Sequence, residues 1–321
     1  MDSTGSGSTS APASTPGLGS VSAEAKVGGA AEAITFAGVT KSFGHKTVLQ
    51  EFDLSVHRGE VFALLGANGA GKTTVINILT TLENTDSGAV HVMGVDVRTD
   101  PAEAKRRFAV TGQSAAVDTY LSTAENLVLL GRLSGLSRRA AKARSEELAL
   151  SLSLNSFMDR RVGSLSGGMR RRLDLALSLV VPVDVLILDE PTTGLDTRSR
   201  RELWAEIERL SAEGTTVFLT TQYLEEADAL ADRIGLLDRG RLTGLGTPSQ
   251  LKARVGEDTV AVHDEEGSTV AEEPTDGTVR GIAAVLTPLL DASPGASVSL
   301  RTPSLDDVFL AFTSTDANPN R

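Results

Sequence analysis

One run of eight residues, with the pattern G-x-x-x-x-G-K-T, has the composition of a loop that binds phosphate groups. Glycines allow the backbone to curl so that successive N–H groups converge on one anion. The helix predicted from Lys72 adds its positive end, and the Lys72 ammonium supplies a charge for the β- and γ-phosphates of a nucleotide. The Thr73 hydroxyl is a Mg²⁺ ligand. An ordinary Gly-rich turn is the alternative. The predicted nucleotide-binding residues here are Gly66, Ala67, Asn68, Gly69, Ala70, Gly71, Lys72, Thr73 and Thr74.

A second chemical feature is a pair of carboxylates at the end of an apolar strand. Residues 185–188 read VLIL and are followed by Asp189 and Glu190. In open α/β sheets the carboxyl ends of the strands line the ligand crevice. We therefore predict that Asp189 holds Mg²⁺ and that Glu190 is the general base for an attacking water. A plain strand terminus is the alternative. The presence of the phosphate-binding run in the same chain favours the functional interpretation.

A third feature is the run Leu-Ser-Gly-Gly-Met at residues 165–169, just before a predicted helix. Two glycines at a helix start form a second anion-binding nest, and the Ser166 hydroxyl is able to donate to a phosphate. One nucleotide does not need two such nests from one subunit. The economical interpretation is that Ser166, Gly167 and Gly168 face the nucleotide of a partner subunit, although alone the run would be only a loop.

The order of these motifs along the chain resembles ABC ATPases closely, from about Ile34 to Ala253. The matching residues are the phosphate-binding run, Gln113, Leu165 to Gly168, Asp189 with Glu190, and Gly194 to Asp196. The resemblance implies an α/β fold: a RecA-like P-loop NTPase core with a mainly parallel sheet and an inserted helical subdomain. The residues after Gly256, with short β-like runs and two helices, predict a small C-terminal α+β appendage, which many members of the family lack. The resemblance also implies a head-to-tail homodimer that sandwiches two ATP molecules with Mg²⁺.

The same resemblance assigns roles to residues outside the three runs. Gln113 would be the lid glutamine, a catalytic residue that contacts Mg²⁺ and the attacking water; a solvated loop glutamine is the alternative. Phe43 would stack on adenine, with core packing as its alternative. Asp196 would contribute to nucleotide binding.

One position departs from the family pattern. The family usually has His after the strand that ends Leu-Thr-Thr, and this chain has Gln222. Glutamine donates a hydrogen bond to a γ-phosphate but cannot be charged or relay a proton. We assign Gln222 to the catalytic site as a γ-phosphate sensor only. A slower ATPase and a degenerate, regulatory subunit both remain open, and the presence of Lys72, Ser166 and Glu190 favours the slower ATPase.

Three segments narrow the resemblance to the daunorubicin/doxorubicin-resistance class of exporter ATPases: residues 170–176, 220–228 and 303–310. This class implies export of a drug or natural product from the cytoplasm. The ATPase would sit at the cytoplasmic face of the membrane beside an integral membrane permease encoded as a separate chain. For the permease contact we favour Tyr120, Leu121 and Leu130, with internal helix packing as the alternative.

Composition excludes several other classes of protein. The formal net charge is −11, and residues 256–321 contain 12 Asp and Glu against 3 Arg, so the rest of the chain is near neutral. A generic nucleic-acid binder needs a basic surface, so we expect no nucleic acid as a partner. The chain has no cysteine, which excludes disulfides and thiolate metal sites. No run reaches 18 apolar residues, and no signal peptide is predicted.

The elements that must position the motifs follow from the sequence pattern. Residues 1–33 are rich in Ser, Gly, Ala, Thr and Pro and are expected to be a disordered leader, with a docking arm as the alternative. The ATPase domain is predicted at 34–253, with helices at 123–133 and 138–154 inside a helical subdomain at about 114–165. Strands alternate with helices in the remainder, which favours a parallel sheet. The appendage covers 254–321, with helices near 282–290 and 304–312.

A soluble ABC ATPase without a permease is the other functional alternative. Ribosome-acting forms typically carry two motif sets in one chain, and DNA-acting forms carry long coiled coils between the motifs. This chain has one set, and only about 90 residues separate Lys72 from Ser166.

Overall fold

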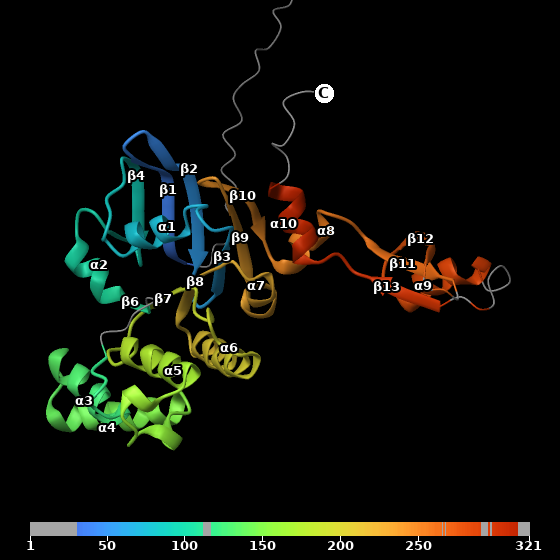
Figure 1. Cartoon of the computed structure of the whole chain (residues 1–321). Helices are drawn as coiled ribbons and strands as arrows, with labels where there is room; N and C mark the ends of the chain where they lie inside the picture. The colour runs from blue at the N-terminus through green and yellow to red at the C-terminus, as the bar shows by residue number, and fades with distance from the viewer. Residues whose placement is uncertain are drawn as a thin grey trace, which may run out of the picture. The chain divides into compact units, whose positions relative to one another are not determined.

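The computed structural model describes residues 31–111, 117–264, 266, 268–289, 295 and 297–313 (Figure 1). The central feature is a six-stranded sheet with the strand order β10-β9-β3-β8-β7-β6. Strands β6, β7, β8, β3 and β9 run parallel, and β10 pairs antiparallel with β9. The bounds are β3 Val61–Leu65, β6 Phe108–Thr111, β7 Val185–Asp189, β8 Thr216–Thr221, β9 Arg233–Asp238 and β10 Arg241–Gly246.

Both faces of this sheet are buried, which explains its uninterrupted apolar strands. In β3, Val61, Ala63 and Leu65 belong to one hydrophobic core, whereas Phe62 and Leu64 belong to the other. The Phe62 ring stacks on that of Phe218 in β8, with ring centroids 5.8 Å apart. The predicted parallel α/β fold is confirmed, and β3 and β7 lie where they were expected.

A second, antiparallel sheet covers one side of the core with the order β2-β1-β4-β5. Strand β1 begins at Glu32, and Ala33 is buried, so the first strand begins slightly before the expected position at Ile34. Residues 1–30 of the predicted leader lie outside the described residues. The bounds are β1 Glu32–Phe43, β2 Lys46–His57, β4 Ser87–Val92 and β5 Val95–Asp96.

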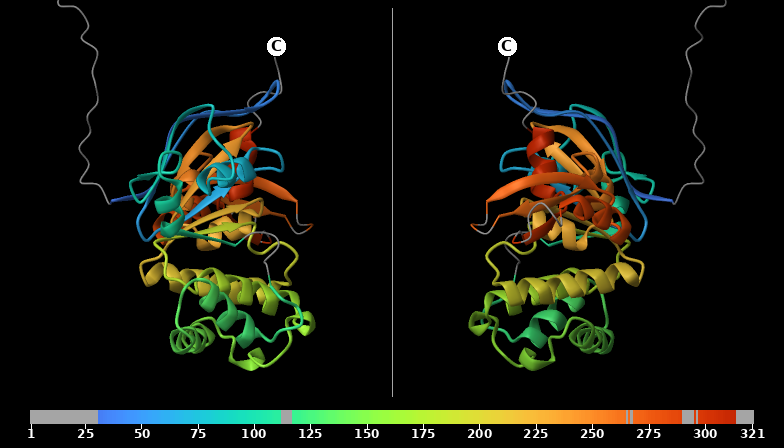
Figure 2. Two further views of the ribbon diagram at one scale, coloured as in Figure 1. Left: turned by 90° about the vertical axis from the view of Figure 1, so that its left-hand side faces the viewer. Right: turned by 90° about the vertical axis from the view of Figure 1, so that its right-hand side faces the viewer.

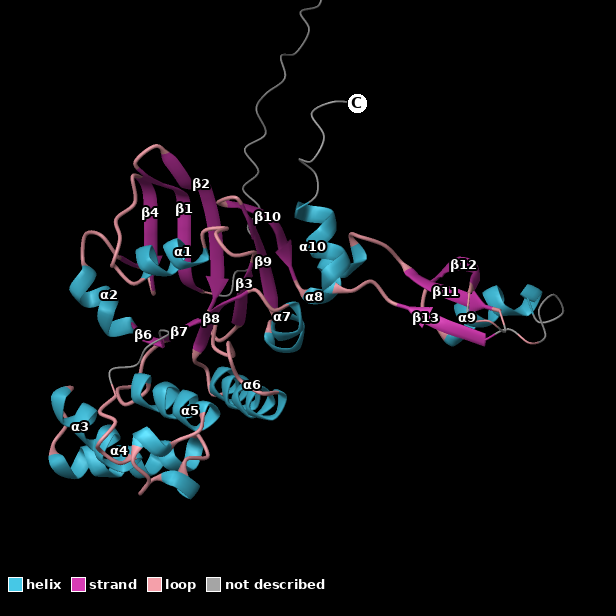
Figure 3. Ribbon diagram, in the orientation of Figure 1, coloured by secondary structure: helices cyan, strands magenta, loops and turns pink. Residues whose placement is uncertain are grey.

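The helices that matter for the site lie next to the ends of the parallel strands. Helix α6 contacts both β8 and α5, and α5 contacts β6. Figure 2 shows this yellow-green and yellow part of the chain from two sides. Figure 3 shows α3, α4 and α5 as an all-helical group. Both predicted helices of the inserted subdomain are present. The bounds are α1 Lys72–Leu79, α2 Pro101–Arg107, α3 Thr123–Leu133, α4 Arg138–Ser151, α5 Gly167–Ser178, α6 Thr197–Ala212 and α7 Leu224–Leu230.

The C-terminal region divides into two parts. An antiparallel sheet, β12-β11-β13, carries helix α9, whereas α10 packs against α7, α8 and β10. Leu305 and Val308 of α10 belong to the main hydrophobic core, so this last helix is not confined to the predicted appendage. None of the described helices is long and apolar enough to cross a membrane. The bounds are α8 Pro248–Ala253, β11 Asp258–His263, β12 Thr269–Thr275, α9 Val279–Leu286, β13 Ser297–Arg301 and α10 Leu305–Thr313.

The docking of α10 gives a stability prediction. Leu305 is 3% exposed and Leu310, on the same helix, is 62% exposed. Leu305→Ala should lower the free energy of unfolding by about 2–5 kcal/mol because it leaves a cavity in the core. Leu310→Ala should change it by less than about 0.5 kcal/mol. Urea denaturation of both variants measures the difference, and equal effects would show that α10 does not contribute to the core.

Candidate nucleotide-binding site

The Gly-rich loop between β3 and α1 has a backbone that requires glycine. Gly69 and Gly71 have φ angles of 82° and 119°, in the left-handed region that residues with a Cβ rarely adopt. A Cβ on Gly66 would lie 2.6 Å from the carbonyl oxygen of Leu237. The loop is tied to neighbouring strands, because Gly66 N donates to Thr221 O at 3.3 Å and Gly240 N donates to Ala70 O at 3.0 Å. It is therefore a rigid, preformed loop at a helix N-terminus.

Lys72 is buried at the base of this loop. Its Nζ donates to Gly66 O at 2.7 Å and to Ala67 O at 3.2 Å, and lies 3.7 Å from Glu190 Oε1. Burial lowers the pKa of Lys72, while the nearby carboxylates of Glu190 and Asp189 raise it. The sequence predicted both groups for the site, and the fold brings them together.

The two carboxylates at the end of β7 are held by β8. Asp189 Oδ1 accepts a hydrogen bond from Thr220 Oγ1 at 2.7 Å, and Glu190 N donates to Thr220 O at 3.1 Å. Thr193 Oγ1 donates to Glu190 Oε2 at 3.2 Å. Glu190 has a φ of 46°, a left-handed conformation that costs about 1–2 kcal/mol for a residue with a side chain. Its carboxylate is thus oriented by Thr193 and Lys72, and its backbone is held by Thr220.

Gln222 follows β8 directly and is half-buried. The preceding residue, Thr221, accepts the hydrogen bond from Gly66 N, so the segment that carries Gln222 is attached to the Gly-rich loop. In a parallel sheet the carboxyl ends of β3, β7 and β8 lie at one edge. This edge therefore collects the Gly-rich loop, both carboxylates and Gln222.

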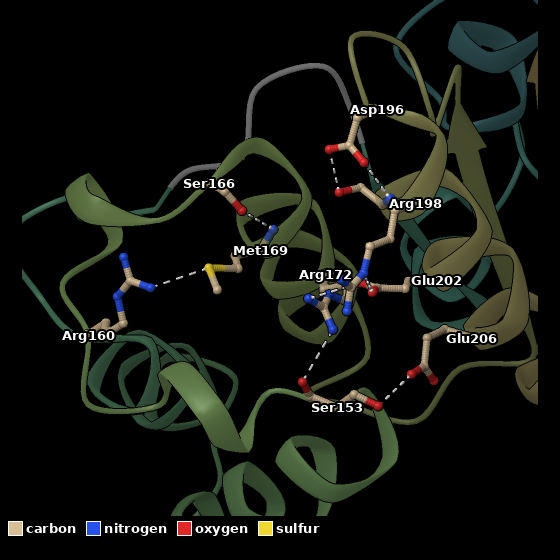
Figure 4. A network of polar contacts seen from close by, with 10 residues as sticks. Ser153, Arg160, Ser166, Met169, Arg172, Asp196, Arg198, Glu202 and Glu206 are labelled. Atoms are coloured by element: carbon tan, nitrogen blue, oxygen red, sulfur yellow. Dashed lines mark hydrogen bonds and ion pairs between the residues drawn. The ribbon is translucent and has the colours of Figure 1, made fainter.

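Ser166 and Asp196 begin two helices that pack on each other (Figure 4). Ser166 Oγ accepts from Met169 N at 3.3 Å as the N-cap of α5. Asp196 caps α6 by accepting from the N and Oγ of Ser199, and these bonds hold the pKa of the Asp196 carboxyl below its usual range. A Cβ on Gly168 would lie 2.5 Å from Ser199 Oγ, so glycine allows the close approach of α5 to α6. Ser166, Gly167 and Asp196 are exposed.

The remaining predicted site residues differ in how exposed they are. Phe43 is 46% exposed, with Lys41 Nζ 4.8 Å from its ring centroid, so it is not a core residue. Thr73 is exposed and Thr74 half-buried. Tyr120 is 83% exposed. Leu130 packs against the main core, which agrees with the alternative of internal helix packing for that residue. Gln113 lies outside the described residues.

Sequence reasoning missed a buried charged cluster behind the carboxylates. Arg171 on α5 donates from Nε to Pro191 O at 2.8 Å and from Nη2 to Asp189 O at 3.3 Å. Glu226 on α7 is fully buried, and burial raises the pKa of its carboxyl; Trp204 Nε1 donates to Glu226 Oε1 at 3.3 Å. The available signal was the charge of Asp174 within the apolar run Leu-Asp-Leu of α5.

The Gly-rich loop between the parallel strand β3 and helix α1, with two carboxylates at the end of β7 and one strand, β8, between them, defines a P-loop NTPase. A family model described as ABC transporter matches residues 49–193. The daunorubicin resistance ATP-binding protein DrrA2 of Streptomyces coeruleorubidus is 45% identical over 305 residues, covering 88% of this chain and 95% of the relative. The chain belongs to the ABC transporter family of ATP-binding subunits, which are ATPases.

Other relatives and solved structures agree with this family. The doxorubicin resistance ATP-binding protein DrrA of Mycobacterium tuberculosis is 44% identical over 88% of this chain and 94% of its own length. A solved ATP-binding subunit of an ABC transporter has a TM-score of 0.61 and 26% identity, covering 69% of this chain and 92% of that one. A dimeric ATP-binding cassette in a post-hydrolysis state, bound to ADP and Pi, has a TM-score of 0.59 at 22% identity, covering 67% and 98%, and shares the fold.

Asp174 provides a pH-dependent prediction. The pKa of its carboxyl is raised from 3.8 to about 6 by burial, although the positive charges of Arg171 and Arg170 lower it in part. The stability that its protonated form contributes is complete below the unfolded value of 3.8 and is lost as the pH rises through about 6. Asp174→Asn stays neutral, so its melting temperature should rise relative to the parent protein between about pH 4 and pH 7.

The matched control is Asp159→Asn, at an exposed position of the same region. Its melting temperature should follow that of the parent protein across the same pH range. A constant difference between Asp174→Asn and the parent at every pH would contradict the assignment.

Proposed function

We propose that this chain energises the export of an amphipathic drug or natural product by a membrane permease that is a separate chain. The names of the resistance ATP-binding relatives, which match over 88% of this chain, support this substrate class. ABC ATP-binding subunits are peripheral to the membrane, and this one would act at the cytoplasmic face. The exposed Tyr120 and the half-buried Leu121 are our remaining candidates for the permease contact. The observation that supports ATP hydrolysis by this site is the distance of 3.7 Å between Lys72 Nζ and Glu190 Oε1.

The Gly-rich loop, residues 66–71, binds the triphosphate through its backbone N–H groups, and Lys72 turns from the loop carbonyls toward the β- and γ-phosphates. Phe43 stacks on the base. Thr73, Asp189 and Gln113 hold Mg²⁺, which neutralises phosphate charge when bound. The described residues contain no cluster of three or more His, Asp or Glu side chains placed for a metal. That fits Mg²⁺, which is usually held by one or two carboxylates together with substrate phosphates and water.

Hydrolysis then needs a base, an oriented water and a sensor of the γ-phosphate. Glu190 accepts a proton as the water oxygen bonds to the γ-phosphorus, and the bond from that phosphorus to the β,γ-bridging oxygen breaks. Gln222 donates to a γ-phosphate oxygen without taking a proton. The bond from Thr193 Oγ1 to Glu190 Oε2 orients the base and leaves Glu190 Oε1 for the water.

We also infer that two copies assemble head to tail, with Ser166, Gly167, Gly168 and Asp196 of each copy facing the ATP bound to the other. In support, Ser166 and Asp196 are exposed at the neighbouring starts of two packed helices. ATP must bind the closed dimer better than the open one. A shift from 1:99 to 99:1 requires about 5.5 kcal/mol of differential affinity, which two bridged γ-phosphates would supply together.

The base assignment is tested by Glu190→Gln. This variant keeps the shape of the side chain but cannot accept the proton, so turnover should fall by at least about 100-fold while ATP-dependent dimers persist. Steady-state phosphate release and size-exclusion chromatography with Mg-ATP measure the two properties. Normal hydrolysis by Glu190→Gln would remove Glu190 as the base.

The composite site is tested by mixing two inactive variants. Lys72→Ala should lose ATP affinity, and Ser166→Arg should block the nest that faces the partner. In a head-to-tail heterodimer of these two chains, one site carries both lesions and the other carries neither. Phosphate release should therefore reappear on mixing. If each subunit completed its own site, the mixture would remain as inactive as the separate variants.

A further inference from the structure

Arg171 joins helix α5 to the turn that holds Glu190. Its Nε donates to Pro191 O at 2.8 Å and its Nη2 donates to Asp189 O at 3.3 Å, and these carbonyls belong to the two residues that flank Glu190. A guanidinium presents its N–H groups in a rigid planar fork. Two donors from one fork therefore restrain both the position and the orientation of the turn.

The turn needs such restraint because its backbone is strained. Glu190 has a φ of 46° and is followed by Pro191, whose ring crowds the residue before it. Strained residues of this kind persist only where the surroundings hold them. Thr220 and Thr193 restrain Glu190 from the side of β8 and from within the turn. Arg171 restrains the turn from α5.

Arg171 carries its charge in a half-buried place near several carboxyl groups. Burial lowers the pKa of Arg171, but the carboxylates of Asp174, Glu226 and Asp189 oppose that shift. A charged donor makes stronger hydrogen bonds to carbonyls than a neutral one. Arg171 thus supplies charged donors to the two carbonyl groups on either side of Glu190, whose carboxylate faces Lys72.

Helix α5 also begins at the Ser166 loop. Arg171 lies five residues after Ser166, less than two helical turns away, on the same rigid element. A displacement of the Ser166 loop therefore moves the guanidinium, and with it the carbonyls on either side of Glu190.

We propose that Arg171 is a positioning residue for ATP hydrolysis, which sets the Glu190 carboxylate against the reacting phosphate according to the placement of the Ser166 loop. This inference rests on the proposed role of Glu190 as the base. The hydrogen bonds described for Arg171 go to the backbone of the Glu190 turn, so its loss should affect turnover and leave ATP binding intact. Misplacement of a catalytic group by about 1 Å is enough to reduce a rate by about 100-fold.

The test compares Arg171→Gln with a matched control, Arg144→Gln. Arg144 on α4 also donates to two consecutive backbone carbonyls, Leu179 O at 2.7 Å and Val180 O at 3.3 Å, but these lie at the far end of α5. For Arg171→Gln we expect kcat to fall by about 10- to 100-fold, with an unchanged KM for ATP and intact ATP-dependent dimers. Arg144→Gln should retain kcat. Arg171→Lys, which keeps the charge without the fork, should have an intermediate kcat.

Each other outcome overturns the inference. A parental kcat for Arg171→Gln, or equal losses of kcat and melting temperature in Arg171→Gln and Arg144→Gln, would leave Arg171 with no positioning role. If Arg171→Gln does not fold, Arg171→Lys decides: an intermediate kcat at parental KM supports the inference, whereas a parental kcat or an unfolded protein rejects it. Failure of the base assignment is seen separately, as hydrolysis by Glu190→Gln.

Discussion

The rest of the site depends on a buried ammonium that faces a carboxylate across the edge of a parallel sheet. Lys72 is 5% exposed, and an ammonium in such a place is costly unless it is paired and hydrogen-bonded. Two carbonyls of the Gly-rich loop and the Glu190 carboxylate meet that requirement. Because the loop already surrounds the ammonium, an incoming triphosphate replaces existing partners and does not have to organise a loose side chain.

This arrangement requires strands that are distant in the sequence to lie in the same part of the sheet. Lys72 follows β3 and Glu190 follows β7, and β8 lies between the two strands and pairs with both. The end of β8 serves both neighbours: Thr221 O accepts from Gly66 N, and Thr220 holds Asp189 and Glu190. A change in β8 would therefore alter the Gly-rich loop and the proposed base, Glu190, together. Gln222 continues this strand, which is the physical reason for assigning it to the same site.

Helix α5 links the loop at Ser166 to the turn that holds Glu190. Its first turn is capped by Ser166 and its second carries Arg171. Farther along, Arg172 Nη1 donates to Ser153 O at 3.4 Å, and its Nη2 lies 3.4 Å from Glu202 Oε2 of α6. Helix α5 is thus held to its neighbours on several sides, so it moves as one element. In a dimer of the proposed kind, closure on the partner's nucleotide would be transmitted to the base through this helix.

The sequence by itself determined the local features of the protein. The Gly-rich loop, the β7 carboxylates and the main strands and helices follow from short-range patterns, because turn geometry, capping and double-sided burial each depend on a few adjacent residues. Helix α2 and strand β6 were not predicted, since seven and four residues are too few for a clear period. The positive φ of Glu190 also has no signal in the sequence.

Only the tertiary structure decided which side chains support the site. Arg171 sits among three consecutive arginines, and nothing in the sequence distinguishes the one that reaches Asp189 O and Pro191 O. The packing of α10 on α8 and the inward position of Leu130 are likewise contacts between distant segments. Such contacts depend on how whole elements dock, whereas the motifs depend on the chemistry of neighbours in the chain. That difference is why the motif residues of the candidate site were predicted and the residues that hold them in place were not.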